Sequence, residues 1–173
     1  MHFIDVESTK EMHEYITDSI RIAKKGVITK ATLIGDAHIE HIKKEPYLFM
    51  VAAVSDYVPK FTQIGKLKKN LLGESYLLEM KQNIDILSSL DKTGIKTVAF
   101  KAEMDEINAH KNALSLLEKK GADAVCLNIL KDSSSFGSED NEIEFISKNS
   151  SKKLPKEDKL SLSFKIVDSS KAL

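Results

Sequence analysis

The chain has 173 residues, with 26 Lys and Arg against 26 Asp and Glu and a single cysteine, Cys126. A chain of this length is typical of one domain and buries roughly 70% of its unfolded surface, so it can form a core without disulfides or metals. The balanced charge provides no field that would attract nucleic acid or an anionic membrane. A single cysteine suits a reducing compartment, and the sequence has no signal-peptide pattern and no apolar run near ~18 residues. These features predict a soluble cytoplasmic protein.

The N-terminal part of the chain predicts a short strand and then a helix. Residues 2–6 alternate weakly between apolar and polar side chains. Ser8 and Glu11 follow in the S-x-x-E order of a capping box, and apolar residues at helical spacing continue to a stop near Gly26. Residues 27–45 have no clear period, and a short helix is indicated there only at residues 37–44.

The rest of the chain alternates between strands and helices. Residues 104–120 have helical spacing and end before Gly121, where a C-cap glycine belongs. Residues 142–147 are polar enough for an edge strand, and the tail 159–167 fits both an alternating strand and a helix, of which we favour the helix. Three continuous apolar runs are typical of strands covered on both faces: YLFMVAAV (47–54), IKTVAF (95–100) and ADAVCLNI (122–129).

This order of elements predicts an α/β fold, with a doubly wound, mainly parallel, Rossmann-like sheet and helices on both faces. The run at residues 47–54 is expected to be a central strand. Ligands of such sheets bind outside the carboxyl ends of the strands. That rule indicates four segments: Ser55 with Asp56, residues 100–103, Asn128, and the loop at residues 133–141.

A long polar stretch separates the first two apolar runs. Residues 58–76 contain Lys60, Lys66, Lys68 and Lys69 together with glycines and a proline. A loop of this length inside a domain is typical of a lid, a binding loop or disorder. We predict a mobile loop whose lysines could hold a polyphosphate as point charges, and a solvated basic loop without a ligand is the alternative.

Six motifs in unbroken order give the chain a resemblance to a known family. They are AAVSDYVPK (52–60), GKLKK (65–69), QNIDIL (82–87), AFKAE (99–103), DAVCLN (123–128) and FGSEDNE (136–142). In this order and spacing the sequence resembles phosphopantothenate-cysteine ligase, also called phosphopantothenoylcysteine synthetase. In many bacteria this enzyme is the C-terminal half of the bifunctional flavoprotein of coenzyme A biosynthesis. The resemblance covers residues 3 to about 155 and implies a single ligase-type nucleotide-binding domain over residues 1–173.

The resemblance implies a two-step reaction. The carboxylate of 4'-phosphopantothenate attacks the α-phosphate of CTP and releases pyrophosphate, and the amine of cysteine then displaces CMP from the acyl-cytidylate. Positioning and charge stabilisation would supply most of the catalysis. The family further implies Mg²⁺ on the phosphates, a homodimer, and a flavin-dependent decarboxylase domain upstream; nucleic acid and membranes are not expected as partners.

Site residues follow from the same motifs. Lys66 matches the family's catalytic lysine, and Asp56 matches an aspartate that contacts the nucleotide. Phe100 matches an aromatic residue that lines the cytidine site, and Lys120 matches a second basic contact. The other nucleotide-binding positions implied are Met50, Val51, Ala52, Ile84, Asp85, Ile86 and Leu87, and no metal ligand is assigned.

The sequence departs from the family pattern at several positions. The family's N-terminal glycine-rich strand-to-helix turn, and the segment after it that grips phosphopantothenate, have no counterpart in residues 1–173. Ile84 replaces the usual proline, Lys101 replaces an alanine, and Leu116 stands where another nucleotide-binding lysine is expected. The chain therefore matches the C-terminal portion of the ligase, and a fragment or one part of a split enzyme is an open alternative.

Each residue also has a structural interpretation. Asp56 could cap its own turn, Phe100 could be a core residue, and Cys126 is expected to be inert in the core. His38 and His41 have metal-ligand spacing but no third ligand, which is typical of a helix surface. Two other functions stay open: a cytidine-nucleotide-binding module without catalysis, and a nicotinamide-dependent oxidoreductase, which lacks support from any G-x-G-x-x-G motif.

Overall fold

The computed structural model describes residues 2–29, 40–42, 44–62, 65–68, 70, 73–130 and 137–173. Its main sheet has five strands in the order β3 (Tyr47–Met50), β6 (Lys96–Glu103), β7 (Ala124–Ile129), β8 (Asp140–Ser147) and β9 (Ser151–Asp158). β3, β6 and β7 are parallel, whereas β8 and β9 join antiparallel.

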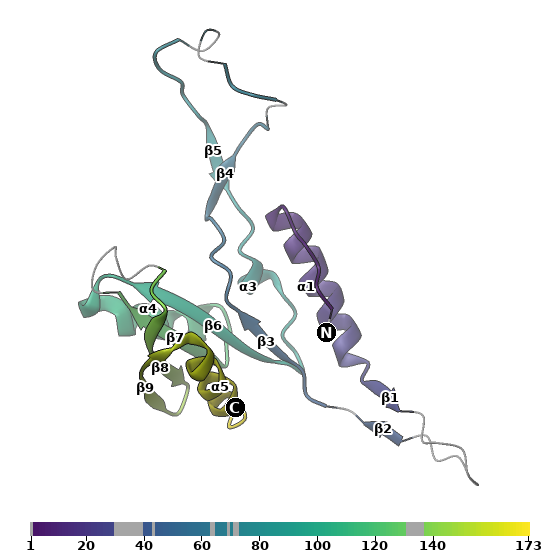
Figure 1. The fold of residues 1–173 in the computed structure, drawn as a ribbon. Coiled ribbons are helices and arrows are strands. Elements are labelled where there is room, and N and C mark those ends of the chain that lie inside the picture. The colour runs from purple at the N-terminus through teal and green to yellow at the C-terminus, as the bar shows by residue number, and fades with distance from the viewer. Residues whose placement is uncertain are drawn as a thin grey trace.

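Helices cover both faces of this sheet (Figure 1). On one face, α3 (Ile86–Ser89) and α4 (Glu106–Lys119) contribute buried residues, and α1 (Thr9–Lys24) packs against the same cluster. On the other face, α5 (Lys159–Ser170) inserts Leu162 and Ile166. Side chains of a strand alternate between faces, so Val125 and Leu127 join the first cluster and Cys126 the second. The predicted doubly wound α/β fold is confirmed.

The predicted capping box begins α1. The Ser8 hydroxyl accepts a hydrogen bond from the Glu11 amide, and the Glu11 carboxylate accepts from the amides of Glu7 and Ser8. These backbone hydrogen bonds lower the pKa of Glu11 below its usual value. None of the residues of α1 is fully buried, and the helix contacts the core through partly buried side chains only.

The parallel unit β6, α4 and β7 forms where the apolar runs predicted it. Asp105 caps α4 by accepting hydrogen bonds from the amides of Ile107 and Asn108. The chain leaves the helix through Gly121, whose φ of 61° is a left-handed conformation that favours glycine. Ala109, Ala113 and Leu117 then face the sheet at helical spacing.

The first apolar run differs from its prediction in length and position. Only Tyr47–Met50 is a strand, and it lies at one edge of the described sheet instead of its centre. After Met50 the chain runs to Asp56 without strand pairing, and Val51, Ala52 and Ala53 are exposed. The apolar run at 47–54 therefore predicted a longer strand than the structure has, because its pairing with β6 ends at Met50.

Three other sequence predictions are also corrected, and one strand was missed. Residues 2–6 form no strand, and residues 40–42 of the predicted short helix form strand β2 (Glu40–Ile42), paired with β1 (Val27–Thr29); His38 lies outside the described residues. The segment at 142–147 is not an edge strand, because β9 pairs along its outer side. β9 itself was missed, since it contains Pro155 and has a polar sequence.

A two-stranded ribbon projects from the carboxyl end of β3 (Figure 1). It consists of β4 (Tyr57–Pro59) and β5 (Met80–Gln82), which pair antiparallel. The loop with the lysines forms the far end of this ribbon (Figure 1). Hydrogen bonding extends the ladder by one step, because the Lys60 amide donates to the Glu79 carbonyl. Among the described residues, no helix is long and apolar enough to cross a lipid bilayer.

Candidate nucleotide-binding site

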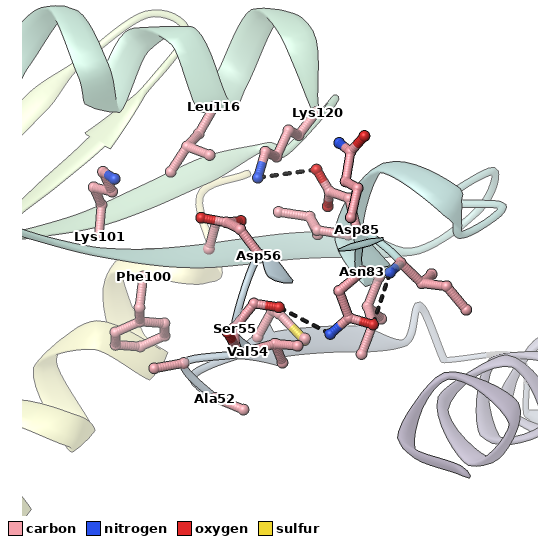
Figure 2. Close-up of a pocket in the computed structure, with 17 residues that line it drawn as sticks. Ala52, Val54, Ser55, Asp56, Asn83, Asp85, Phe100, Lys101, Leu116 and Lys120 are labelled. Carbon is pink, nitrogen blue, oxygen red and sulfur yellow. Dashed lines mark hydrogen bonds and ion pairs between the residues drawn. The ribbon is translucent and has the colours of Figure 1, made fainter. Parts of the chain in front are cut away.

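A cavity of about 310 Å³ opens at the carboxyl end of β3, beside the middle of β6 (Figure 2). The carboxyl end of a strand is where doubly wound sheets bind ligands. The lining combines the segment after β3, the start of α3, the middle of β6 and the last turn of α4. The residues are Met50, Ala52, Ala53, Val54, Ser55, Asp56, Gln82, Asn83, Ile84, Asp85, Ile86, Leu87, Ala99, Phe100, Lys101, Leu116 and Lys120.

Asn83 organises one wall of the cavity. Its side-chain amide donates to the Ser55 carbonyl at 2.8 Å and to the Thr9 hydroxyl at 2.9 Å, and its backbone amide donates to the Asp56 carbonyl at 2.8 Å. The side-chain oxygen accepts from the Ile84 amide. One residue therefore holds the segment after β3 against the start of α3, which compensates for the pairing that the segment lacks.

Asp85 and Lys120 form the polar end of the cavity. The Asp85 carboxylate caps α3 by accepting from the Ser88 amide at 3.1 Å and from the Ser88 hydroxyl at 2.8 Å. Lys120 Nζ lies 3.1 Å from Asp85 Oδ2. Burial raises the pKa of Asp85, but the hydrogen bonds from Ser88 and Lys120 lower it by more, so the pKa lies below its usual value.

Phe100 and Lys101 leave β6 toward opposite faces of the sheet. Phe100 packs against the cluster that contains α5, whereas Lys101 points to the side of α4, near Leu116 (Figure 2). Phe100 also lines the cavity, so its core contact and its place in the site are compatible. The cavity is therefore lined from both faces of the sheet, beyond the end of β3.

The structure brings together every predicted site residue except Val51 and Lys66. Val51 is exposed and does not line the cavity. Lys66 is exposed in the segment between β4 and β5. Asn128, near the end of β7, does not line the cavity. Of the predicted loop at 133–141, residues 133–136 lie outside the described residues, and residues 137–141 do not line the cavity.

Asp56 contributes a carboxylate that makes no hydrogen bond or ion pair with the described residues. It lies in the cavity, and no described residue donates a hydrogen bond to its side chain. The alternative that it caps its own turn is therefore not supported among these residues, whereas Asp85 does act as such a cap. An exposed carboxylate in this position can accept hydrogen bonds from a ligand or bind a hard cation.

Sequence reasoning missed Asn83 as a site residue, although it stands in the quoted motif QNIDIL. The feature that could have indicated Asn83 is its position two residues before Asp85, the N-cap of α3, because two short polar side chains this close are typical of a turn. The role of Asn83 depends on the carbonyls of Ser55 and Asp56, which only the fold brings near.

A doubly wound sheet with a polar cavity beyond the carboxyl end of a parallel strand defines a class of α/β proteins that is typical of small-ligand binding at this edge. Within that class, the chain belongs to the family described as the DNA/pantothenate metabolism flavoprotein C-terminal domain, whose model matches residues 23–173. The resemblance to the ligase portion of the coenzyme A biosynthesis flavoprotein is therefore confirmed.

Among curated relatives, the chain is similar to the coenzyme A biosynthesis bifunctional protein CoaBC of Thermococcus kodakarensis, with 30% identity over 169 residues. That match covers 95% of this chain and 36% of the relative, so the chain spans about a third of the relative's length. A CoaBC from Vibrio parahaemolyticus is 32% identical over 126 residues, which cover 70% of this chain and 31% of that protein.

Solved structures support the fold. The C-terminal domain of a CoaBC protein aligns with a TM-score of 0.61 at 20% identity, covering 96% of this chain and 62% of that one. The DNA/pantothenate metabolism flavoprotein from Streptococcus pneumoniae aligns with a TM-score of 0.62 at 19% identity, covering 97% of this chain and 69% of that one.

Proposed function

We propose that the protein takes part in coenzyme A biosynthesis by ligating 4'-phosphopantothenate to cysteine with CTP as the energy source, in the cytoplasm. The observation that carries the proposal is the cavity itself. Residues from three separate motifs, represented by Asp56, Asp85 and Phe100, line one cavity beyond the carboxyl end of β3, together with Lys120. Family membership and relatives named for coenzyme A biosynthesis support the same pathway.

The proposed reaction has two displacements. An oxygen of the 4'-phosphopantothenate carboxylate forms a bond to the α-phosphorus of CTP, and the bond to the β-phosphate oxygen breaks, which releases pyrophosphate. The cysteine nitrogen then attacks the acyl carbon, loses a proton and displaces CMP, which leaves an amide. Both steps develop negative charge on phosphate oxygens, so fixed cations near them would lower the barriers.

The residues of the cavity suit these tasks. Ala52 and Ala53 have small side chains beside which a nucleotide can approach the backbone closely. The ring of Phe100 offers an apolar surface for a base, and the ammonium of Lys120 offers a donor to an anion. Lys66 would approach the phosphates only when the ribbon loop, or the loop of another protomer, closes over the cavity.

Mg²⁺ fits the donor set of this cavity. Magnesium in nucleotide sites is held by one or two carboxylates together with substrate phosphates. Asp56 offers a carboxylate that no described residue engages, whereas Asp85 is occupied by Ser88 and Lys120. Asp56 would therefore hold the ion, which would supply charge neutralisation on the triphosphate.

The proposal includes a homodimer and, in the complete protein, a flavin-dependent decarboxylase domain upstream. The ribbon supports self-association, because it exposes large apolar side chains far from the core. Phe61 is 66% exposed, Leu77 94% and Leu78 47%. Two-stranded ribbons are marginally stable in water alone, and exposed apolar groups of this kind are typical of contacts with another chain. A second protomer would cover them and could receive Lys66 in its cavity.

Calorimetric titration tests the nucleotide preference. We expect CTP with Mg²⁺ to bind more tightly than ATP, GTP or NAD, with Asp56→Asn weakening the binding of CTP. A preference for NAD would overturn the proposal in favour of an oxidoreductase. Release of pyrophosphate from CTP upon addition of 4'-phosphopantothenate, followed by CMP release upon addition of cysteine, tests the ligation itself.

A nucleotide-binding module without catalysis is the second candidate. The cavity lining does not include Lys66, which lies between β4 and β5, and this observation favours such a module. This candidate predicts the same CTP binding with no release of pyrophosphate, so turnover separates the two functions.

A further inference from the structure

The charged lining residues of the cavity are Asp56, Asp85, Lys101 and Lys120, which carry no net charge together. A polyphosphate enters such a cavity more favourably if a cation of the lining can turn from its own carboxylate toward the ligand. The two lysines differ in how firmly they are held.

Lys120 is held within the cavity. Its ammonium lies 3.1 Å from Asp85, which also lines the cavity and is fixed by its cap of α3. A phosphate that binds Lys120 must therefore compete with a neighbouring carboxylate and approach that carboxylate closely, which is unfavourable for like charges.

Lys101 is held from outside the cavity. Its ammonium lies 3.2 Å from Glu103, which shares its face of β6 but does not line the cavity. The Glu103 side chain is only 15% exposed and also accepts a hydrogen bond from Asn112 Nδ2 at 2.9 Å. Glu103 therefore keeps one hydrogen bond, from Asn112, when Lys101 turns toward a ligand.

The surroundings of Lys101 favour a strong ion pair with a bound phosphate. In Figure 2, Lys101, Leu116 and Lys120 lie on the side of β6 that faces α4. The lysine side chain is 38% exposed and stands beside the apolar Leu116, so an ion pair with a bound phosphate would be partly shielded from water. A rigid strand interior also places the stem of Lys101, in register with Leu127 of β7.

We propose that Lys101 binds the phosphate chain of the nucleotide and thereby selects a polyphosphate over a nucleoside. The inference rests on the proposed nucleotide function but assigns a residue that the family motifs do not supply, since Lys101 departs from the family pattern. Lys101 acts here by binding and orienting the phosphates.

Titration of a probe series tests this role. The probes are cytidine, CMP, CTP and inorganic tripolyphosphate, measured by calorimetry. A hydrogen bond to a charged group contributes enough free energy that Lys101→Met should weaken the binding of CTP and tripolyphosphate roughly 10- to 100-fold. The affinity for CMP should fall less, and the affinity for cytidine should not change. Lys101→Arg should retain most of the affinity, because it keeps the charge.

Three further variants separate binding from structure. Lys96→Met is the matched control, because Lys96 stands on the same strand, pairs with Glu45 at 3.8 Å and does not line the cavity. Glu103→Gln should tighten CTP binding, since it frees Lys101, which a merely structural role would not do. Lys101→Met combined with Leu116→Lys should recover part of the affinity, because it returns a cation to the same space. Thermal midpoints of all variants identify any unfolding.

The outcomes distinguish the two proposals. Unchanged CTP binding in Lys101→Met would overturn the role of Lys101 and leave the ligase proposal intact. Tripolyphosphate binding that depends on Lys101, without preference for CTP over ATP and GTP, would support Lys101 and overturn the CTP assignment. If the unmodified chain binds none of the phosphate probes, both proposals are wrong.

Discussion

Lys120 and Asp85 join the end of α4 to the start of α3 through an ion pair of 3.1 Å at the polar end of the cavity. The same aspartate caps α3, so one carboxylate serves both local structure and the site. The pair links two segments that are far apart in sequence and fixes the width of the cavity between them.

Substitution of Asp85 should reduce stability in a pH-dependent way. Asp85→Ala removes the cap and should lower the free energy of unfolding by about 1 kcal/mol at pH 7. Asp85→Asn keeps a cap acceptor and should cost less. The pKa of Asp85 is lowered in the folded state, so the contribution of its charge is full above the unfolded pKa and is lost as pH falls through the folded pKa.

Urea unfolding of these variants at pH 7 and in steps below pH 4 provides the measurement. The difference between the unmodified protein and Asp85→Asn should shrink toward the acid end. Asp105→Ala is the matched control, since Asp105 caps α4 outside the cavity and should cost similar stability without changing CTP binding. A pH-independent difference for Asp85→Asn would contradict the role of its charge.

Lys66→Ala should slow the ligation without unfolding the protein. Loss of a single electrostatic stabiliser usually costs about 10² to 10³ in rate. Lys66 is exposed in the ribbon loop, so the urea midpoint should not change. Pyrophosphate release reports the rate, and Lys68→Ala, in the same exposed loop, is the control. An unchanged rate in Lys66→Ala would refute the catalytic assignment.

Leu127→Ala should destabilise the fold by about 2 to 5 kcal/mol, because it leaves a void in the core. Leu127 is 1% exposed and packs in the cluster that includes α3 and α4. Leu114→Ala, at a position that is 46% exposed on α4, should change the free energy of unfolding far less. Urea unfolding at pH 7 compares the two, and equal losses would place Leu127 outside the core.

Cys126 should be unreactive in the folded protein. Burial raises the pKa of its thiol to about 12, so almost none is present as the reactive thiolate near pH 8. Ellman's reagent should therefore modify the native protein very slowly and the urea-unfolded protein quickly, with one equivalent per chain. Rapid modification of the native protein would contradict the buried position.

Local patterns predicted the elements whose signals lie within a few residues. The capping box of Ser8 and Glu11 and the glycine stop at Gly121 are short-range hydrogen-bonding and steric effects, and both are found in the structure. The apolar runs of β6 and β7 predicted buried strands correctly, because burial on both faces demands apolar side chains at every position. The motif order identified most of the cavity lining in advance.

Pairing between distant segments could not be predicted in the same way. β9 has a polar sequence with Pro155, and only its ladder to β8 makes it a strand and moves β8 away from the edge. Only the first half of the run at 47–54 forms a strand, because pairing with β6 ends at Met50. The ribbon of β4 and β5 likewise depends on contacts across more than twenty residues of chain.

The amino-acid sequence by itself determined the α/β class, the helix ends and the family, since periodicity, caps and ordered motifs are properties of neighbouring residues. Only the tertiary structure decided how the site is assembled. It placed Lys101 and Lys120 in one cavity, attached Asn83 to the carbonyls after β3, and left Lys66 outside the cavity lining. These relationships depend on where parallel strands end beside one another, which no local pattern specifies.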